Sequence, residues 1–270
     1  MATSRPQVYV TQQQQEMLGA WENGGYCGLA GSILDMERNY SRQINESRTI
    51  NQTQHMSHAI MLLSQHEELM PSILQNCLIE DIKNRTVPLD PRFKIIHAKQ
   101  LQEDVACGLY INYLLDPRGY GLTVTEYEEF VEGMIACIEN RTMRSHRSGF
   151  NIDQAATAYF LSYTGRAKNE IPNMRKSCSG KTNLQDFKAS QAALIADAKA
   201  QKPTEVRIPG EAGFSINVHT RCYEHDKLQG SANFFRLARC VLNALWPARK
   251  FILHSVYVFQ AFMALPEQKW

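Results

Sequence analysis

The stretch TEYEEFVEGMIACI, residues 125–138, carries the strongest structural signal in the chain. Its large apolar residues recur at intervals of three and four, which places them on one face of an α-helix. They are Tyr127, Phe130, Val131, Met134, Ile135 and Ile138. Thr125 and Glu128 have the spacing of a capping box, in which each side chain accepts from the other's exposed backbone N–H at the start of a helix. The stretch therefore predicts an amphipathic helix that buries one face.

Helical spacing recurs on both sides of this stretch. The other segments predicted as helices are 53–69, 72–83, 153–163, 184–200, 231–245 and 248–265. Gly165 is placed to end the helix 153–163. Pro-Gly and Ala-Gly pairs within residues 205–218 allow one small β-hairpin. The predicted fold class is all-α, with at most this one hairpin.

Residues 165–182 differ in composition from their neighbours. They are rich in Arg, Lys, Asn, Ser and Gly and contain Pro172, which is typical of a linker between domains. We therefore predict an N-terminal helical domain over residues 1–164, a basic linker over 165–182 and a C-terminal helical domain over 183–270.

The composition is that of a globular protein with a real core, at 44% hydrophobic and 21% charged residues. The first fifteen residues are polar, unlike a secretory signal. The longest apolar stretch, 251–265, is interrupted by polar residues and is shorter than the roughly 20 residues a bilayer span needs. Seven scattered cysteines without a Cys-x-x-Cys pattern are typical of reduced thiols. The protein is predicted to be neither secreted nor transmembrane.

The net charge of +2 hides an asymmetry. Residues 1–135 carry 10 Lys/Arg and 17 Asp/Glu, a net charge of −7, whereas residues 136–270 carry 19 and 10, a net charge of +9. One interpretation is uneven solvation of two subdomains. The other is head-to-tail self-association, or a basic face that binds phosphates.

The cations of the second half are dense between residues 136 and 182, with eight Lys/Arg against three Asp/Glu. Three of them follow the predicted helix 125–138, where cations also complement the helix dipole. The functional interpretation is a patch that binds the phosphates of RNA or of lipid headgroups. Its residues are Arg141, Arg144, Arg147, Arg166, Lys168, Arg175, Lys176 and Lys181. No aromatic residues are interleaved to stack bases, so binding is expected to be electrostatic and blind to sequence.

Two further groups contain residues that bind metals. His55 and His58, followed by Glu67, fit a helical metal-dependent hydrolase, but the pattern His-Glu-x-x-His is absent and surface histidines are the commoner interpretation.

The second group is His219, Cys222 and His225, at spacings of three, with no fourth ligand of a zinc site nearby in the sequence. No nucleophile motif such as Gly-x-Ser-x-Gly occurs. The chain is therefore predicted to be non-enzymatic, with no metal, cofactor or small-molecule substrate.

Four short segments add a resemblance. They are residues 96–99 (IHAK), 106–112 (ACGLYIN), 124–126 (VTE), and Cys137 leading to 144–147 (RSHR). Together, and in this order, they resemble the middle of influenza matrix proteins. The chain is thus similar to the orthomyxovirus matrix family, and its length suits a thogotovirus-type member.

Two features of that family are absent from this chain. A zinc-like cluster of two cysteines and two histidines is reduced to Cys137 and His146, with Met143 near the place of the second histidine. A compact basic run before His97 has no counterpart, because the cations there are scattered: Lys83, Arg85, Arg92, Lys94 and Lys99. Zinc binding and import by that run are therefore not carried over.

The resemblance implies two N-terminal helical subdomains and a C-terminal helical domain. It also implies a structural viral protein that polymerises beneath the virion envelope, binds ribonucleoprotein or RNA, contacts the anionic inner leaflet peripherally and supports budding. Its other expected locations are the host cytoplasm, the nucleus and the inner face of the plasma membrane.

His146, flanked by Arg144 and Arg147, is expected to act as a pH switch that gains charge in acid and loosens the layer. The alternatives are a helical viral nucleoprotein that binds RNA and, from another class, the metal-dependent hydrolase built on His55, His58 and Glu67.

Overall fold

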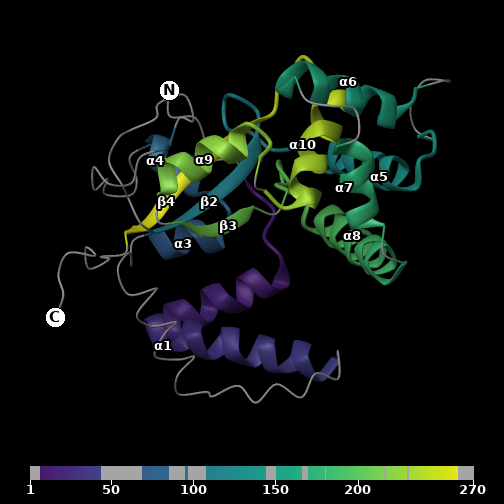
Figure 1. Ribbon diagram of the computed structural model, residues 1–270. Coiled ribbons are helices and arrows are strands. Elements are labelled where there is room, and N and C mark those ends of the chain that lie inside the picture. Colours follow the sequence, from purple (N-terminus) through teal and green to yellow (C-terminus); the bar gives the residue numbers. More distant parts are fainter. Residues whose placement is uncertain are drawn as a thin grey trace. The chain divides into compact units, whose positions relative to one another are not determined.

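The computed structural model describes residues 7–43, 69–84, 95–96, 108–143, 150–165, 170–179, 181–208, 210–215, 217–229 and 231–260. Within them the chain is mostly helical, with nine helices and one antiparallel sheet (Figure 1). The chain divides into two compact units. The small unit is Val10–Arg92, and the large unit combines Met1–Tyr9 with Phe93–Trp270.

The small unit is built from helices α1 (Gln12–Gln43), α3 (Met70–Leu74) and α4 (Leu78–Asn84). Gly25 breaks α1 into two arms, with φ 54° and ψ −140°, a conformation that glycine adopts without steric cost. The buried core between the arms and α3 consists of Trp21, Leu29, Met70 and Leu74. A folded-back α1 therefore supplies half of its own core.

Gly28 allows the two arms of α1 to approach closely. A Cβ at this position would lie 2.1 Å from the carbonyl oxygen of Ala20 on the first arm, which no real side chain tolerates. Gly28 thus fixes how near the arms lie at this point.

In its described residues the large unit contains six helices and the sheet. The helices are α5 (Val124–Glu139), α6 (Ile152–Thr164), α7 (Glu170–Cys178), α8 (Lys181–Gln201), α9 (Val218–Asp226) and α10 (Asn233–Leu245). The strands are β1 (Ile95–Ile96), β2 (Gly108–Leu115), β3 (Glu211–Ser215) and β4 (Ile252–Gln260).

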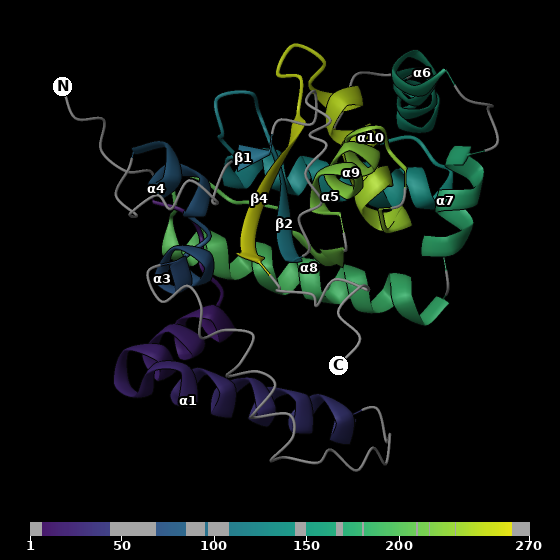
Figure 2. The ribbon, with the colours of Figure 1, turned by 60° about the vertical axis from the view of Figure 1, so that its left-hand side comes forward.

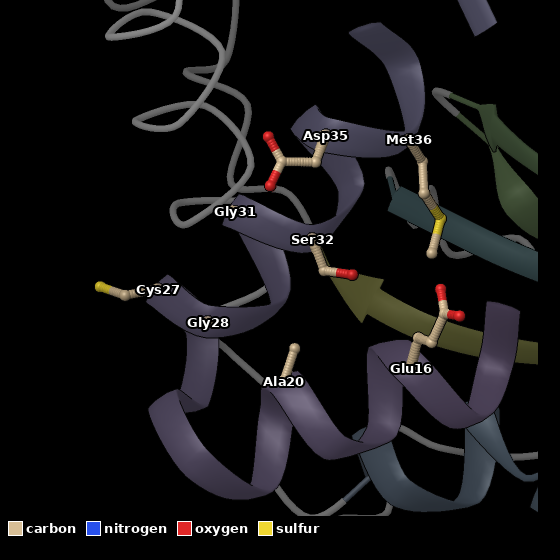
Figure 3. A pocket seen from close by; sticks show the side chains of 8 residues that line it. All are labelled: Glu16, Ala20, Cys27, Gly28, Gly31, Ser32, Asp35 and Met36. Carbon is tan, nitrogen blue, oxygen red and sulfur yellow. The ribbon is translucent and has the colours of Figure 1, made fainter. Parts of the chain in front are cut away.

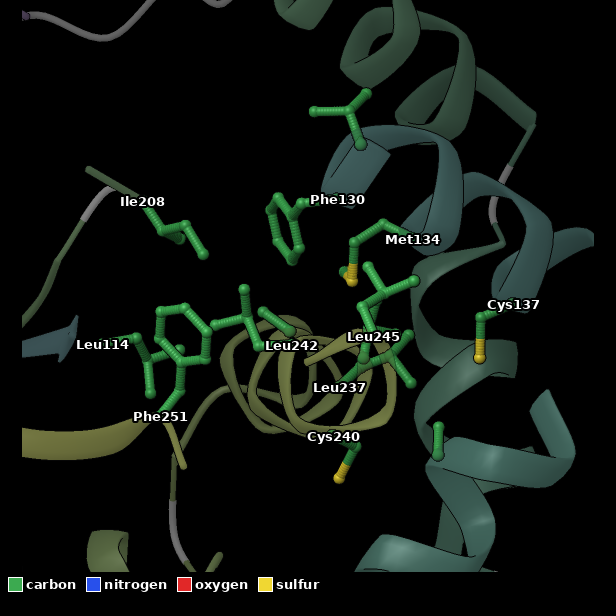
Figure 4. Close-up of a cluster of buried hydrophobic side chains, with 14 of the residues drawn as sticks. Leu114, Phe130, Met134, Cys137, Ile208, Leu237, Cys240, Leu242, Leu245 and Phe251 are labelled. Carbon is green, nitrogen blue, oxygen red and sulfur yellow. The ribbon is translucent and has the colours of Figure 1, made fainter. Parts of the chain in front are cut away.

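Helix α10 is the centre of the large unit's core. Nine of its thirteen residues are buried, and it packs against α5, α6 and α7. Figure 4 shows α10 nearly end-on, with Phe130 and Met134 of α5 on one side and Leu114 of β2 and Phe251 on another. A helix that is buried nearly all round has neighbours on most sides, and α10 has both helices and a strand.

The sheet has the strand order β1-β4-β2-β3, and every pairing is antiparallel. Strand β4 lies between β1 and β2 and pairs with β2 from Leu115↔Ile252 to Gly108↔Gln260, with an irregularity at Leu109/Tyr110 (Figure 2). Helix α9 packs on β2, β3 and β4. The sheet thus joins segments more than 130 residues apart.

The helix predicted over 248–265 is wrong, because residues 252–260 form the strand β4. Leu253, His254, Ser255, Val256 and Tyr257 are buried in succession, as expected of an inner strand covered on both faces. A strand that is buried on both faces shows no alternation of apolar and polar residues, so periodicity does not distinguish it from a buried helix. The β-branched and aromatic residues of this segment, such as Ile252, Val256 and Tyr257, favour a strand over a helix.

Two further predictions near the sheet need correction. Residues 108–112 of the matrix-like segment 106–112 belong to strand β2, so this part of the resemblance does not adopt the helical fold that it implied. The hairpin expected within 205–218 is not formed: β3 pairs with β2, while Glu205 and Val206 bridge to Val8 and Leu122. The fold is therefore mostly helical rather than all-α.

The predicted linker 165–182 contains helix α7, which takes part in the core. Ile171 and Met174 of α7 are fully buried in the same cluster as Phe160 and Leu242. Two apolar residues three positions apart are enough to anchor a short helix, but they are too few to stand out in a polar segment. The boundary between compact units lies near residues 9–10 and 92–93 instead of 164 and 183.

The helices predicted over 125–138, 153–163 and 184–200 are confirmed as α5, α6 and α8. Gly165 ends α6 in the left-handed conformation, as expected. The capping box is shifted by two residues: Thr123 accepts from the backbone N–H of Glu126, and the Glu126 carboxylate accepts from the backbone N–H of Thr123. The predicted helix 53–69 lies outside the described residues except for Leu69.

The capping box predicts a difference between two neighbouring threonines. Replacing Thr123 with Ala removes the cap and should lower the free energy of unfolding by about 1 kcal/mol. Thr125 lies two residues further along the helix and is exposed. Thr125→Ala should therefore change the free energy of unfolding by less than about 0.5 kcal/mol. Urea unfolding followed by circular dichroism measures both, and equal losses would contradict the assigned cap.

Candidate functional site

Three of the eight predicted phosphate-binding cations have described side chains. These are Arg141, Arg175 and Lys176. Arg144, Arg147, Arg166 and Lys168 lie outside the described residues, as does His146, and Lys181 is described only as the first residue of α8.

Arg141 follows the left-handed cap residue Asn140 at the end of α5. Its Nε donates to the Glu139 carboxylate over 2.8 Å, and Lys188 of α8 donates to the same carboxylate. The hydrogen bonds from Lys188 and then Arg141 hold the pKa of Glu139 below its usual range. Two cations on one carboxylate leave a surface cluster with a single net positive charge, and Lys188 was not among the predicted residues.

Arg175 is engaged within the protein. Its guanidinium lies 3.2 Å from the Asp153 carboxylate of α6, and its side chain is only 18% exposed. Lys176 on the next position of α7 is exposed, with no side-chain partner among the described residues. Of the three described cations, Arg175 thus ties α7 to α6, and Lys176 remains directed to solvent.

Helix α8 adds cations that the sequence patterns did not single out. Lys199 bonds Glu128 of α5 and remains 55% exposed, and Lys188 remains 39% exposed. Lys202, just after α8, is also exposed. They lie outside residues 136–182 in the sequence, but α8 packs on α5, so that Lys188 bonds Glu139 at the end of that helix and Lys199 bonds Glu128 near its start.

The group His219, Cys222 and His225 lies on α9, and two of its members are buried against the sheet. His225 is 2% exposed, and its Nε2 is hydrogen-bonded to the hydroxyl of Tyr110 on β2 over 2.8 Å. Its Nδ1 contacts Ser231 and lies 3.5 Å from a Glu211 carboxylate oxygen on β3. The histidine therefore joins α9 to two strands.

This arrangement does not match a nucleophile-activating triad. Ser231 and Glu211 both approach Nδ1, whereas a triad places the nucleophile and the carboxylate on opposite ring nitrogens. Burial also raises the pKa of the Cys222 thiol to about 12, as it does for Cys137 and Cys240, so these sulfurs are poor nucleophiles at neutral pH. We interpret the network as structural.

Neither metal hypothesis gains support from the geometry. The described residues contain no group of three or more His, Cys, Asp or Glu side chains placed to hold a metal ion. His55, His58 and Glu67 lie outside the described residues. Similarly, none of the helices in the described part of the chain is long and apolar enough to cross a bilayer.

The small unit contains an open cavity of about 510 Å³ between the arms of α1. Figure 3 shows Glu16 and Ala20 on the first arm facing Gly28, Ser32 and Met36 on the second. The side chains of Glu16 and Ser32 point into the space, whereas Cys27 points away from it (Figure 3). We call this cavity the α1 groove.

Protonation of His225 is predicted to destabilise the large unit. Burial lowers its pKa below the ordinary 6.5, helped by Arg221 and opposed by Glu211 and Glu224. Below about pH 6.5 the unfolded chain gains a proton that the folded chain does not, so stability falls as the pH drops, by up to ~1.4 kcal/mol per pH unit.

The test compares the wild type with His225→Gln, which keeps one hydrogen bond but does not titrate. Hydrogen exchange of the β2 amides, corrected for intrinsic rates, measures the opening free energy of the large unit at about pH 7 and about pH 5. The wild type should lose more protection than the variant on acidification. An equal loss in both proteins would assign the pH dependence to other groups.

Comparisons of this chain with protein-family models, with curated proteins and with solved structures returned no match. What the chain does is therefore inferred from its own charge and geometry.

Proposed function

We propose that this chain is a structural, non-enzymatic protein of the viral matrix kind, which self-associates head to tail into a layer on an anionic surface. The observation that carries the proposal is the division of charge between the two compact units. The small unit has 6 Lys/Arg and 10 Asp/Glu, a net charge of −4, and the large unit has 23 and 17, a net charge of +6.

Opposite charges on two units of one chain favour association between copies, because the small unit of one copy attracts the large unit of the next. Such a heterologous contact leaves one acidic and one basic unit unpaired at the ends, so the assembly stays open and grows. Between Gln12 and Met36, α1 carries the exposed acids Glu16, Glu22 and Asp35 and no Lys or Arg. The charge asymmetry seen in the sequence thus follows the two compact units.

The cations of the large unit provide a second contact surface. Lys176 and Lys202 are exposed, and Arg141 is partly exposed. Together with the predicted cations outside the described residues, they support peripheral binding to an anionic inner leaflet or to ribonucleoprotein. A location beneath a virion envelope, and in the host cytoplasm, nucleus and inner plasma membrane, belongs to the same proposal.

Self-association is predicted to depend on salt. At about 0.1 M salt charges interact over ~10 Å, and at about 1 M over ~3 Å, so attraction between oppositely charged units is largely lost at high salt. Sedimentation velocity should show large assemblies at the lower salt and monomers at the higher, and electron microscopy should show layers or helices. A monomer at every salt and protein concentration would overturn the proposal.

The predicted patch is tested by R141A/R144A/R147A. Each cation near an anionic membrane contributes about 1 kcal/mol, so the triple variant should bind phosphatidylserine vesicles about a hundredfold more weakly in flotation assays. The control K83A/R118A/K227A removes the same charge from exposed side chains elsewhere. If both variants lost vesicle binding equally, the effect would be explained by net charge alone, and the predicted patch would be wrong. Protection of RNA to a regular length would favour the nucleoprotein alternative.

A further inference from the structure

The α1 groove has a floor of small residues and a rim with two carboxylates. Ala20, Gly28, Gly31 and Ser32 line it, and Glu16 and Asp35 are exposed at its sides. A Cβ built on Gly31 meets no atom within 4 Å, so space remains above this part of the second arm. A second helix can approach such a floor closely, provided that its own facing side chains are small.

Helix α8 presents a face of this kind. Its outward-facing side chains over more than three turns are mostly alanines, whereas Leu184, Phe187 and Leu194 face the core of the large unit. The exposed small residues are Ala189, Ser190, Ala192, Ala193, Ala196 and Ala200. Exposed faces of α6 and α7 are shorter and more polar in the described part of the chain. Alanine is a good helix former, but it leaves the backbone of this face accessible.

The charges beside the two surfaces are complementary. Lys188 and Lys199 lie along one edge of the alanine face of α8, the edge toward α5, and keep part of their surface exposed although each bonds a glutamate of α5. They are eleven residues apart, about 16 Å along a helix. The groove offers Glu16 and Asp35 and no cation between Gln12 and Met36. Asp186 is exposed at the N-terminal end of this face, three residues before Ala189.

We infer that the α1 groove is the binding site for helix α8 of a second copy of this chain. The small faces pack at close range, and Lys188 and Lys199 of one copy lie beside Glu16 and Asp35 of the other. The inference rests on the proposed head-to-tail self-association and names the surfaces that form it. Because groove and helix lie on different units, each copy uses one surface toward each neighbour.

Filling the groove tests one side of the contact. Gly31→Leu places a side chain in the open space, and Gly19→Leu is the matched control, since a Cβ there also meets nothing and Gly19 does not line the groove. Both changes raise helix propensity equally. Gly31→Leu should weaken association by about tenfold or more, measured by sedimentation over a concentration series, while Gly19→Leu leaves it unchanged. Equal association of the two variants would overturn the inference.

The other side is tested on α8. A193Q/A196Q adds long, neutral side chains to the exposed face, and A158Q adds one to an exposed alanine of α6. The double variant should associate as weakly as Gly31→Leu, and combining the two should weaken association no further, because both block one contact. Normal association of A193Q/A196Q would exclude α8 as the occupant.

A cross-link identifies which copy occupies the groove. Cys27 is an exposed cysteine beside the groove, and Ala196→Cys adds a thiol to the α8 face. In a mixture of two differently tagged chains, a bismaleimide should join Cys27 of one tag to residue 196 of the other. Cross-links confined to single chains at every concentration would contradict the inference. Self-association that persists with Gly31→Leu would contradict it too, yet leave the proposed function standing, whereas a wild type without assemblies would remove both.

Discussion

The burial of Arg239 is the constraint on which the large unit depends. This guanidinium lies in the middle of α10, 1% exposed, and an unpaired charge there would cost several kcal/mol. It donates to the backbone oxygen of Asp226 over 2.7 Å, lies 3.3 Å from that residue's carboxylate, and stacks over the Tyr163 ring at 4.6 Å. The Tyr163 hydroxyl also donates to Asp226. The end of α9 is therefore held against α6 and α10.

Helix α9 carries this constraint to the sheet. Asp226 at its last position contacts the helical core, and the adjacent His225 contacts β2 through Tyr110. On the other side of α10, Asn243 donates to the Phe251 backbone oxygen, which directs the chain into β4. Helical core and sheet are thus joined at two places by buried polar contacts.

Local sequence patterns predicted those helices that are determined by the spacing of their own apolar residues and by their own end residues. Amphipathic spacing located α5, α6 and α8, and Gly165 ended α6 for the conformational reason expected. The strand β4 could not be found this way, because its partners β1 and β2 are more than 130 residues away and its buried run has no distinguishing period. The division into units was equally hidden, since Met1–Tyr9 joins the large unit through a bridge from Val8 to Glu205.

The candidate sites were likewise predictable only where they depend on residues close in sequence. Arg141 and Lys176 stayed at the surface as their polar context indicated, but Arg175 turned inward because Asp153, distant in sequence, meets it. The histidine on α9 likewise became a structural joint through Tyr110 and Glu211.

Net charge, in contrast, is a sum over residues, so the charge asymmetry could be found from the sequence without knowledge of the fold. The structure adds that the opposite charges belong to separate compact units. In the proposed head-to-tail assembly, attraction between the acidic unit of one copy and the basic unit of the next would repeat at every copy added. The inferred contact between the small-residue groove of the acidic unit and the alanine face of the basic unit would give that attraction a defined geometry, which charge alone lacks.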